Sequence, residues 1–183
     1  VEDLIARRSK VIAVVPNDAR ALEPVFRRAR SADIKVLTHE SPDQKGADWN
    51  IELSSVAGFG ERHMDSLGKA MGGEGKYVVF VGSLTVPLHN AWADAAIAYL
   101  GAKYPDMKLI GERYGVAENV DDSRKTALDL MAANPNLGGF LGFGLRWFVC
   151  AVLQAQWLGA PDFFQPVILA NHGLHHVSHG LAA

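Results

Sequence analysis

The chain has 183 residues, of which 49% are hydrophobic, and its formal net charge of −2 gives no general attraction to nucleic acid or acidic membranes. Its single cysteine, Cys150, excludes an intrachain disulfide, and the first 144 residues contain no apolar stretch long enough to span a membrane. This length suffices for one ordinary domain or two small lobes. Because the first residues resemble the end of a helix and no leader precedes them, we expect the chain to be a fragment of a longer protein.

Short apolar runs alternate with amphipathic helices from the start of the chain. Runs at 10–15 and 34–39 predict buried strands, and residues 19–31 between them predict a helix that Asp18 caps. Strand, helix and strand within about 30 residues make one βαβ unit, which is expected to be parallel and right-handed. This unit indicates an α/β protein.

A polar segment then separates this unit from the rest of the chain. The loop at 44–49 and the alternating residues 50–54, predicted as a short strand, suit a crossing between two lobes. Residues 58–71 predict a helix in which His63 is packed or half-buried and is not a ligand. The glycines of 72–76 resemble a phosphate loop, but they follow a helix and precede a strand, so they predict a turn.

The stretch 77–92 is the centre of the predicted second lobe. Residues 77–81 are apolar and rich in β-branched and aromatic side chains, as in a parallel strand buried on both faces. Pro87 can set the entry to a helix. The loop at the carboxyl end of a strand is where open α/β sheets bind ligands. We expect this loop to carry three polar side chains, Thr85, His89 and Asn90.

The later elements complete a doubly wound, Rossmann-like pattern. Strands are predicted at 108–114 and 139–143, with a helix between them capped by Asp121 or Asp122. Gly142 and Gly144 begin a dinucleotide pattern, but Trp147 occupies the third glycine position. We therefore expect no nucleotide and no other cofactor.

Residues 145–183 differ from the chain before them, because only Arg146 and Asp162 in this segment carry formal charge. We predict a packed helix over 145–158 and poor order over 162–183, so that deleting 161–183 leaves stability unchanged or improves it. The segment also holds four histidines, His172, His175, His176 and His179. They could line one helical face and bind a metal, but an exposed tail without a metal site is the expected state.

Six motifs, most of them at strand ends, resemble the type I periplasmic sugar-binding proteins of ABC transporters, nearest to the rhamnose and autoinducer-2 binding group. These motifs are Lys35–Pro42, Trp49–Glu52, Val81–Pro87, Asn90–Trp92, Tyr104–Asp106 and Phe140–Gly144. The resemblance covers about residues 1–144 and implies the periplasmic-binding-protein type I fold, in which two lobes close on a small ligand. After Gly144 the family continues with a glycine- and alanine-bearing helix that this sequence does not resemble, as a shifted reading frame or a spliced end would explain.

The resemblance also implies a division of the chain and a function. Residues 1–55 would be the later part of the N-terminal lobe with a crossing strand, 56–144 part of the C-terminal lobe, and 145–183 an atypical hydrophobic, histidine-rich tail. The expected function is the substrate-binding component of a sugar importer, which is not an enzyme. Its partners would be a small sugar and a membrane permease, without nucleic acid, and its location would be periplasmic.

Matching motifs carry the family's ligand residues to strand ends in both lobes. The implied set is His39, Glu40, Ser41, Leu88, His89, Asn90 and Phe143. Carboxylate, amide and imidazole groups hydrogen-bond sugar hydroxyls, and aromatic faces take the apolar side of the ring. For two residues a structural role without a ligand stays open: Asn90 can cap its helix, and Trp92 is expected in the core.

Two other functions use the same architecture. An enzyme is one, but the sequence shows no nucleophile elbow, metal-ligand spacing or acid–base pair. The effector-binding domain of a sugar-responsive transcriptional repressor is the other. That reading needs a helix-turn-helix upstream of Val1, so the upstream sequence would decide between repressor and transporter component.

Overall fold

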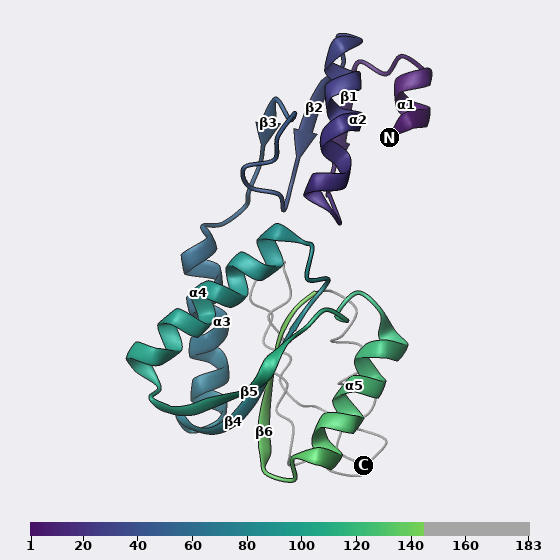
Figure 1. Cartoon of the computed structure of the whole chain (residues 1–183). Coiled ribbons are helices and arrows are strands. Elements are labelled where there is room, and N and C mark those ends of the chain that lie inside the picture. Colours follow the sequence, from purple (N-terminus) through teal and green to yellow (C-terminus); the bar gives the residue numbers. More distant parts are fainter. Residues whose placement is uncertain (145–183) are drawn as a thin grey trace, which may run out of the picture.

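The computed structural model describes residues 1–144, which form two separate three-stranded sheets (Figure 1). The strand orders are β1-β2-β3 and β5-β4-β6, and every pairing is parallel. The strands over 35–38 and 74–81 belong to different sheets, as the sequence predicted. The architecture is the α/β arrangement of two Rossmann-like sheets that the alternation of strands and helices indicated.

The first unit comprises the first sheet with its two helices. Its elements are α1 (Glu2–Ala6), β1 (Val11–Val14), α2 (Ala19–Ser31), β2 (Lys35–Thr38) and β3 (Trp49–Asn50). Asp18 caps α2 as predicted, because its Oδ1 accepts hydrogen bonds from the backbone amides of Arg20 and Ala21. Phe26 of α2 packs on Ile12 and Val36 of the sheet to make a small core.

The predicted strand at 50–54 is wrong in extent, since β3 ends at Asn50. The backbone amide of Ile51 makes one last bond to the carbonyl of Thr38, where β2 itself ends. Residues beyond Ile51 therefore have no strand beside them to pair with. Their alternating pattern reflects an exposed crossing segment, in which Leu53 is 82% exposed.

The second unit comprises the second sheet with three helices. Its elements are α3 (Val56–Ala70), β4 (Glu74–Val81), α4 (Pro87–Lys103), β5 (Asp106–Tyr114), α5 (Val120–Ala133) and β6 (Leu137–Phe143). Helices α3 and α4 cover one face of the sheet and α5 covers the other (Figure 1). The central strand β4 is buried on both faces, as predicted: Tyr77 and Val79 face α3 and α4, and Phe80 faces α5.

Two glycines let α3 and α4 approach closely. A Cβ atom at Gly60 would lie 2.5 Å from the carbonyl oxygen of Trp92, and one at Gly68 would lie 2.5 Å from the ring of Tyr104. Real Cβ atoms do not sit so close to a backbone oxygen, so Gly60 is required by packing. The predicted turn after α3 is also confirmed, with Gly72 and Gly73 at φ of 69° and 84°.

Two helix starts differ from the sequence prediction. Helix α4 begins at Pro87, whose missing amide costs nothing in the first turn, so His89 and Asn90 lie in that turn and not in the loop before it. Helix α5 is capped by Asn119, which accepts from the amides of Asp121 and Asp122. The two aspartates occupy the first turn, where their negative charge interacts favourably with the positive end of the helix dipole.

The predictions for 145–183, namely the helix at 145–158, the poor order of 162–183 and the histidine cluster, fall outside the described residues. Among the helices of residues 1–144, none has the length and apolar character needed to cross a membrane.

Candidate ligand-binding site

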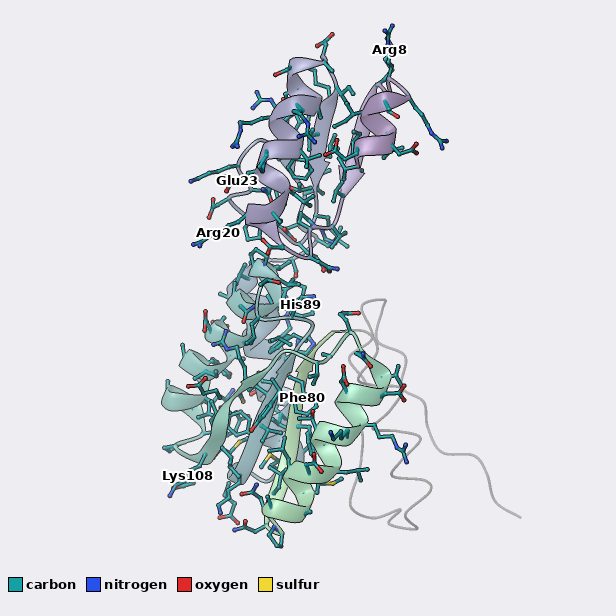
Figure 2. All side chains as sticks on the ribbon, turned by 45° about the vertical axis from the view of Figure 1, so that its right-hand side comes forward. Arg8, Arg20, Glu23, Phe80, His89 and Lys108 are labelled. Carbon is teal, nitrogen blue, oxygen red and sulfur yellow. The ribbon has the colours of Figure 1, made fainter. Side chains whose placement is uncertain are left out.

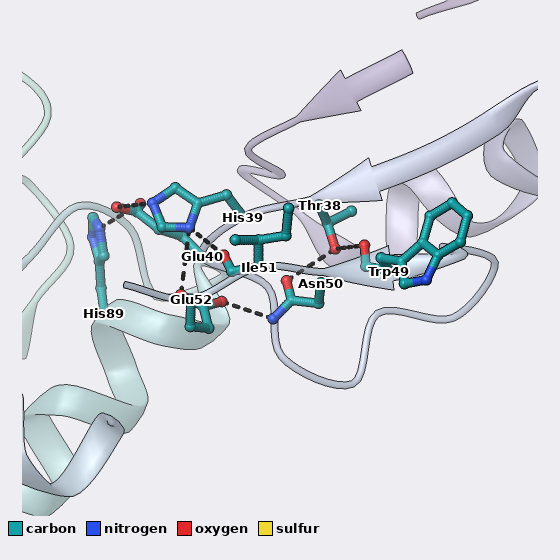
Figure 3. Close-up of polar contacts among 8 residues, drawn as sticks. All are labelled: Thr38, His39, Glu40, Trp49, Asn50, Ile51, Glu52 and His89. Carbon is teal, nitrogen blue, oxygen red and sulfur yellow. Dashed lines mark hydrogen bonds and ion pairs between the residues drawn. The ribbon is translucent and has the colours of Figure 1, made fainter. Parts of the chain in front are cut away.

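Glu40 and His89 join the two units at the carboxyl ends of their sheets. Glu40 follows β2 of the first unit. His89 lies in the first turn of α4, after β4 of the second unit (Figure 2). His89 Nε2 and Glu40 Oε2 are 3.3 Å apart (Figure 3). The side chain of His89 is 7% exposed and that of Glu40 is 19% exposed, so the contact is partly shielded from water. These are the two groups that the sequence placed on facing strand ends.

The backbone of Gly82 holds the other edge of the histidine ring. Its amide donates a hydrogen bond of 3.1 Å to His89 Nδ1 in a buried setting. A neutral imidazole carries one proton, so a ring that accepts at Nδ1 donates at Nε2. The hydrogen-bond network therefore assigns His89 as a donor toward the Glu40 carboxylate. The ring of Trp92 stacks on His89 with 5.5 Å between the centroids.

Glu40 is held in an uncommon backbone conformation. Its φ of 58° is in the left-handed region, which non-glycine residues rarely occupy and which is concentrated at functional sites. The hydrogen bond from His89 lowers the pKa of the Glu40 carboxyl, and the nearby His89 and His39 lower it further, against the opposing effect of burial. The side chain is therefore an ionised hydrogen-bond acceptor at neutral pH.

His39 and the crossing segment support Glu40 from within the first unit (Figure 3). His39 Nε2 lies 3.9 Å from Glu40 Oε1, and its Nδ1 lies 2.6 Å from the carbonyl oxygen of Ile51 and 3.5 Å from Glu52 Oε2. Asn50 Nδ2 donates to Glu52 Oε1 at 2.8 Å. These contacts run from the crossing segment to His89 and fix the position of the carboxylate.

A second bridge between the units was not predicted. Thr85 Oγ1, in the loop after β4, donates a 2.8 Å hydrogen bond to the backbone carbonyl of Asn17, in the loop after β1. Thr85 was expected to meet a ligand, but Asn17 was not named as a site residue. Its position directly after a predicted strand, on the same sheet edge as Glu40, was the signal that could have found it.

The structure does not bring the other predicted ligand residues to this contact. Leu88 is fully buried and Phe143 is 2% exposed, and both belong to the core beneath α3 and α4, where Trp92 also lies as expected. Ser41 is buried and donates to Gln44 Oε1 at 3.0 Å. Each of these side chains is engaged within its own unit, so their ligand roles stay predictions.

Asn90 is engaged within the second unit as well, although it is not the cap of α4. Its Nδ2 donates to the carbonyl oxygens of Ser83 and Val86 at 3.1 and 2.7 Å. Its Oδ1 accepts from Arg113 Nη1 of β5 at 3.1 Å. The amide of Asn90 thus braces the loop that precedes α4, and the structure brings together only His39, Glu40 and His89 from the predicted set.

Comparison with known proteins gives a family and a set of solved relatives. The sequence profile of the periplasmic binding protein domain matches residues 1–163. An ABC transporter solute binding protein from Clostridium phytofermentas with bound L-rhamnose has a TM-score of 0.80 and 26% identity, covering 86% of this chain and 50% of that chain. A solute binding protein from Burkholderia graminis in complex with D-arabinose has a TM-score of 0.74 and 28% identity, covering 88% and 54%.

Other comparisons add less. An ABC sugar transporter subunit from Rhodobacter sphaeroides, with a TM-score of 0.73, 23% identity and coverage of 86% and 57%, shows the fold alone. No curated protein matched. The chain spans about half the length of these solved relatives.

These findings confirm the resemblance to the sugar-binding proteins of ABC transporters and the type I periplasmic-binding-protein fold. The family match also extends past Gly144, where the sequence resemblance was expected to stop, to residue 163. It covers most of the chain. The chain therefore belongs to the periplasmic binding protein domain family.

Proposed function

We propose that the chain is part of the substrate-binding component of an ABC-type importer and binds a small neutral sugar between its two units. The observation that carries the proposal is the Glu40–His89 pair, an ionised acceptor and a donor that face each other from the ends of two separate sheets. In open α/β folds, ligands bind in the crevice outside the carboxyl ends of parallel strands. A sugar held there would contact both units at once.

The charges around the pair favour a neutral ligand. Glu40 and Glu52 are both carboxylates near His39. Within the described residues, their side-chain contacts come from histidine and asparagine rather than from lysine or arginine. A phosphate or carboxylate on the ligand would meet these two carboxylates without a cationic partner. Sugar hydroxyls, in contrast, gain charge-assisted bonds from a carboxylate acceptor. A free sugar therefore fits better than a sugar phosphate or a sugar acid.

Each of the two units corresponds to part of one lobe in this proposal. Residues 1–55 would belong to the later part of the N-terminal lobe with its crossing, and 56–144 to part of the C-terminal lobe. The solved relatives with bound L-rhamnose and D-arabinose support a sugar ligand. A membrane permease as partner and a periplasmic location follow from the family and are parts of the same proposal.

Saturation-transfer difference NMR tests the proposal, because it detects even weak binding by a chain that spans only part of the family's length. The panel comprises pentoses, deoxyhexoses and furanosyl ligands, with sugar phosphates and sugar acids as the comparison set. We expect signal transfer to at least one neutral sugar, and its loss in Glu40→Ala but not in Glu61→Ala, an exposed glutamate of α3. A panel without any binder, or binding that survives Glu40→Ala, contradicts the proposed site.

A further inference from the structure

We propose that Gly82 is a positioning residue that keeps His89 a donor at Nε2, and that the site therefore takes a ligand hydroxyl between His89 and Glu40. The proposal rests on the proposed function for its ligand, and on the geometry of the free chain for the role of Gly82. Gly82 follows β4 directly, is buried, and donates its backbone amide to His89 Nδ1.

Glycine is needed at this position for space and not for backbone conformation. Its φ is outside the left-handed range in which glycine is favoured, unlike that of Gly72 or Gly73. A Cβ atom at Gly82 would lie 2.6 Å from His89 Nδ1 and 2.8 Å from its Cε1. The missing side chain is therefore what lets the imidazole approach the amide closely enough to accept its hydrogen bond.

The resulting pair has one donor and one acceptor. His89 offers a proton at Nε2 because Nδ1 is occupied as an acceptor, and the ionised Glu40 can only accept. A hydroxyl accepts and donates at a single oxygen, so it satisfies both groups when it lies between them. An ammonium group cannot accept from His89, and a carboxylate or a fully ionised phosphate cannot donate to Glu40.

The geometry of the free chain sets a requirement for binding. His89 Nε2 and Glu40 Oε2 are 3.3 Å apart, which leaves no room for a third heavy atom between them. Two successive hydrogen bonds through one hydroxyl hold the outer atoms about 5 Å apart. Ligand binding must therefore separate Nε2 and Oε2 by roughly 2 Å and exchange the direct bond for two bonds through the hydroxyl.

Nitrogen-15 NMR of the histidine rings tests the role of Gly82 in the 183-residue chain without any ligand. The ring-nitrogen signals that disappear in His89→Gln are those of His89. At neutral pH we expect its proton on Nε2 and a bare Nδ1, and we expect this tautomer to persist in Glu40→Ala, because Gly82 and not Glu40 fixes it. A proton on Nδ1 in the wild type, or a change of tautomer in Glu40→Ala, overturns the proposal.

Gly82→Ala is the direct variant, with Gly101→Ala as its matched control because a Cβ at Gly101 meets nothing within 4 Å. We expect Gly82→Ala to displace the His89 ring signals and to weaken sugar binding by about two- to tenfold, as loss of a hydrogen bond between neutral groups does. Wild-type ring signals in a folded Gly82→Ala contradict the positioning role. If this variant does not fold, the tautomer in Glu40→Ala decides the question.

Titration with L-rhamnose and D-arabinose separates this inference from the proposed function. We expect the Nε2 signal of His89 to move on binding while Nδ1 stays bare. If a sugar binds and the His89 signals do not move, the hydroxyl between His89 and Glu40 is wrong although the protein is a sugar binder. If neither these nor any other panel sugar binds, the proposed function and the bridging ligand hydroxyl are both wrong. The ligand-free spectra then remain the test of the role of Gly82.

Discussion

Thr85 Oγ1 donates to the backbone carbonyl of Asn17 across a distance of 2.8 Å, and this bond joins loops that follow the strands β4 and β1 of two different sheets. Together with the Glu40–His89 pair it gives the two units a second point of contact. All four residues come directly or shortly after strand ends, so the two sheets face each other through their carboxyl edges.

The Glu40–His89 contact should depend on acid pH in a defined direction. Because the pKa of Glu40 in the folded chain is lowered from its ordinary 4.5, ionised Glu40 adds stability that is complete above that value and is lost as pH falls through the folded pKa. We expect the difference in free energy of unfolding between wild type and Glu40→Gln to shrink as pH falls below 4.5. Urea denaturation of both proteins across this pH range measures the difference in free energy of unfolding.

The control for this series is Glu61→Gln, which reports what the loss of an exposed carboxylate does by itself. A wild-type advantage over Glu40→Gln that grows toward acid pH would contradict the assignment of Glu40 as an ionised acceptor.

The backbone at Glu40 should be strained independently of its side-chain bond. Both Glu40→Ala and Glu40→Gly remove the carboxylate, but only glycine adopts the φ of 58° without steric cost. After allowance for the extra entropy of unfolded glycine, we expect Glu40→Gly to be more stable than Glu40→Ala by about 0.5–1 kcal/mol. A Glu40→Gly variant that is less stable than Glu40→Ala by the full entropic cost of glycine would show that this backbone conformation carries no strain.

Gly60 should be far less tolerant of alanine than Gly101. A Cβ at Gly60 meets the backbone of α4, so Gly60→Ala must push α3 and α4 apart at a cost of about 1–3 kcal/mol. Gly101 lies within α4 and faces open space, so Gly101→Ala should stabilise the chain by about 0.5–1 kcal/mol. Thermal denaturation of both variants checks the prediction, and a Gly60→Ala variant as stable as wild type would contradict the close helix contact.

Tyr77→Phe should be neutral or stabilising by up to about 1 kcal/mol. The hydroxyl of Tyr77 is buried, finds no hydrogen-bond partner within the described part of the chain, and has its pKa raised to about 12 by burial. Removing it relieves a desolvated polar group and keeps the ring that fills the core. Chemical denaturation measures the change, and a clear loss of stability would reveal a partner for this hydroxyl.

Most of the fold could be predicted from the sequence because local patterns determine it. The run at 77–81 is apolar at every position and consists of β-branched and aromatic residues, which favours a strand buried on both faces. The alternation of such runs with amphipathic helices then gives parallel strands in two sheets. The end of β3 at Asn50 could not be predicted, since it depends on where β2 ends and leaves the crossing without a neighbour.

The site could be predicted only in part, because several side chains depend on the exact helix start. Once α4 begins at Pro87, Leu88 and Trp92 fall on one stripe that faces the core, and His89 is turned to Gly82. The sequence gives no sign that Arg113, on a later strand, engages Asn90. Glu40 and His89 were found because each follows a buried strand, a relation that survives small shifts in element boundaries.

The affinity of the wild type and of Glu40→Ala for whichever neutral sugar gives the strongest signal, measured by NMR titration, tests the central claim most directly. Loss of a hydrogen bond to a charged acceptor costs about 1.5–3 kcal/mol, so Glu40→Ala should bind roughly ten- to a hundredfold more weakly. Glu61→Ala should bind as the wild type does. Equal affinity of Glu40→Ala and wild type would contradict the claim that the two units hold a sugar between Glu40 and His89.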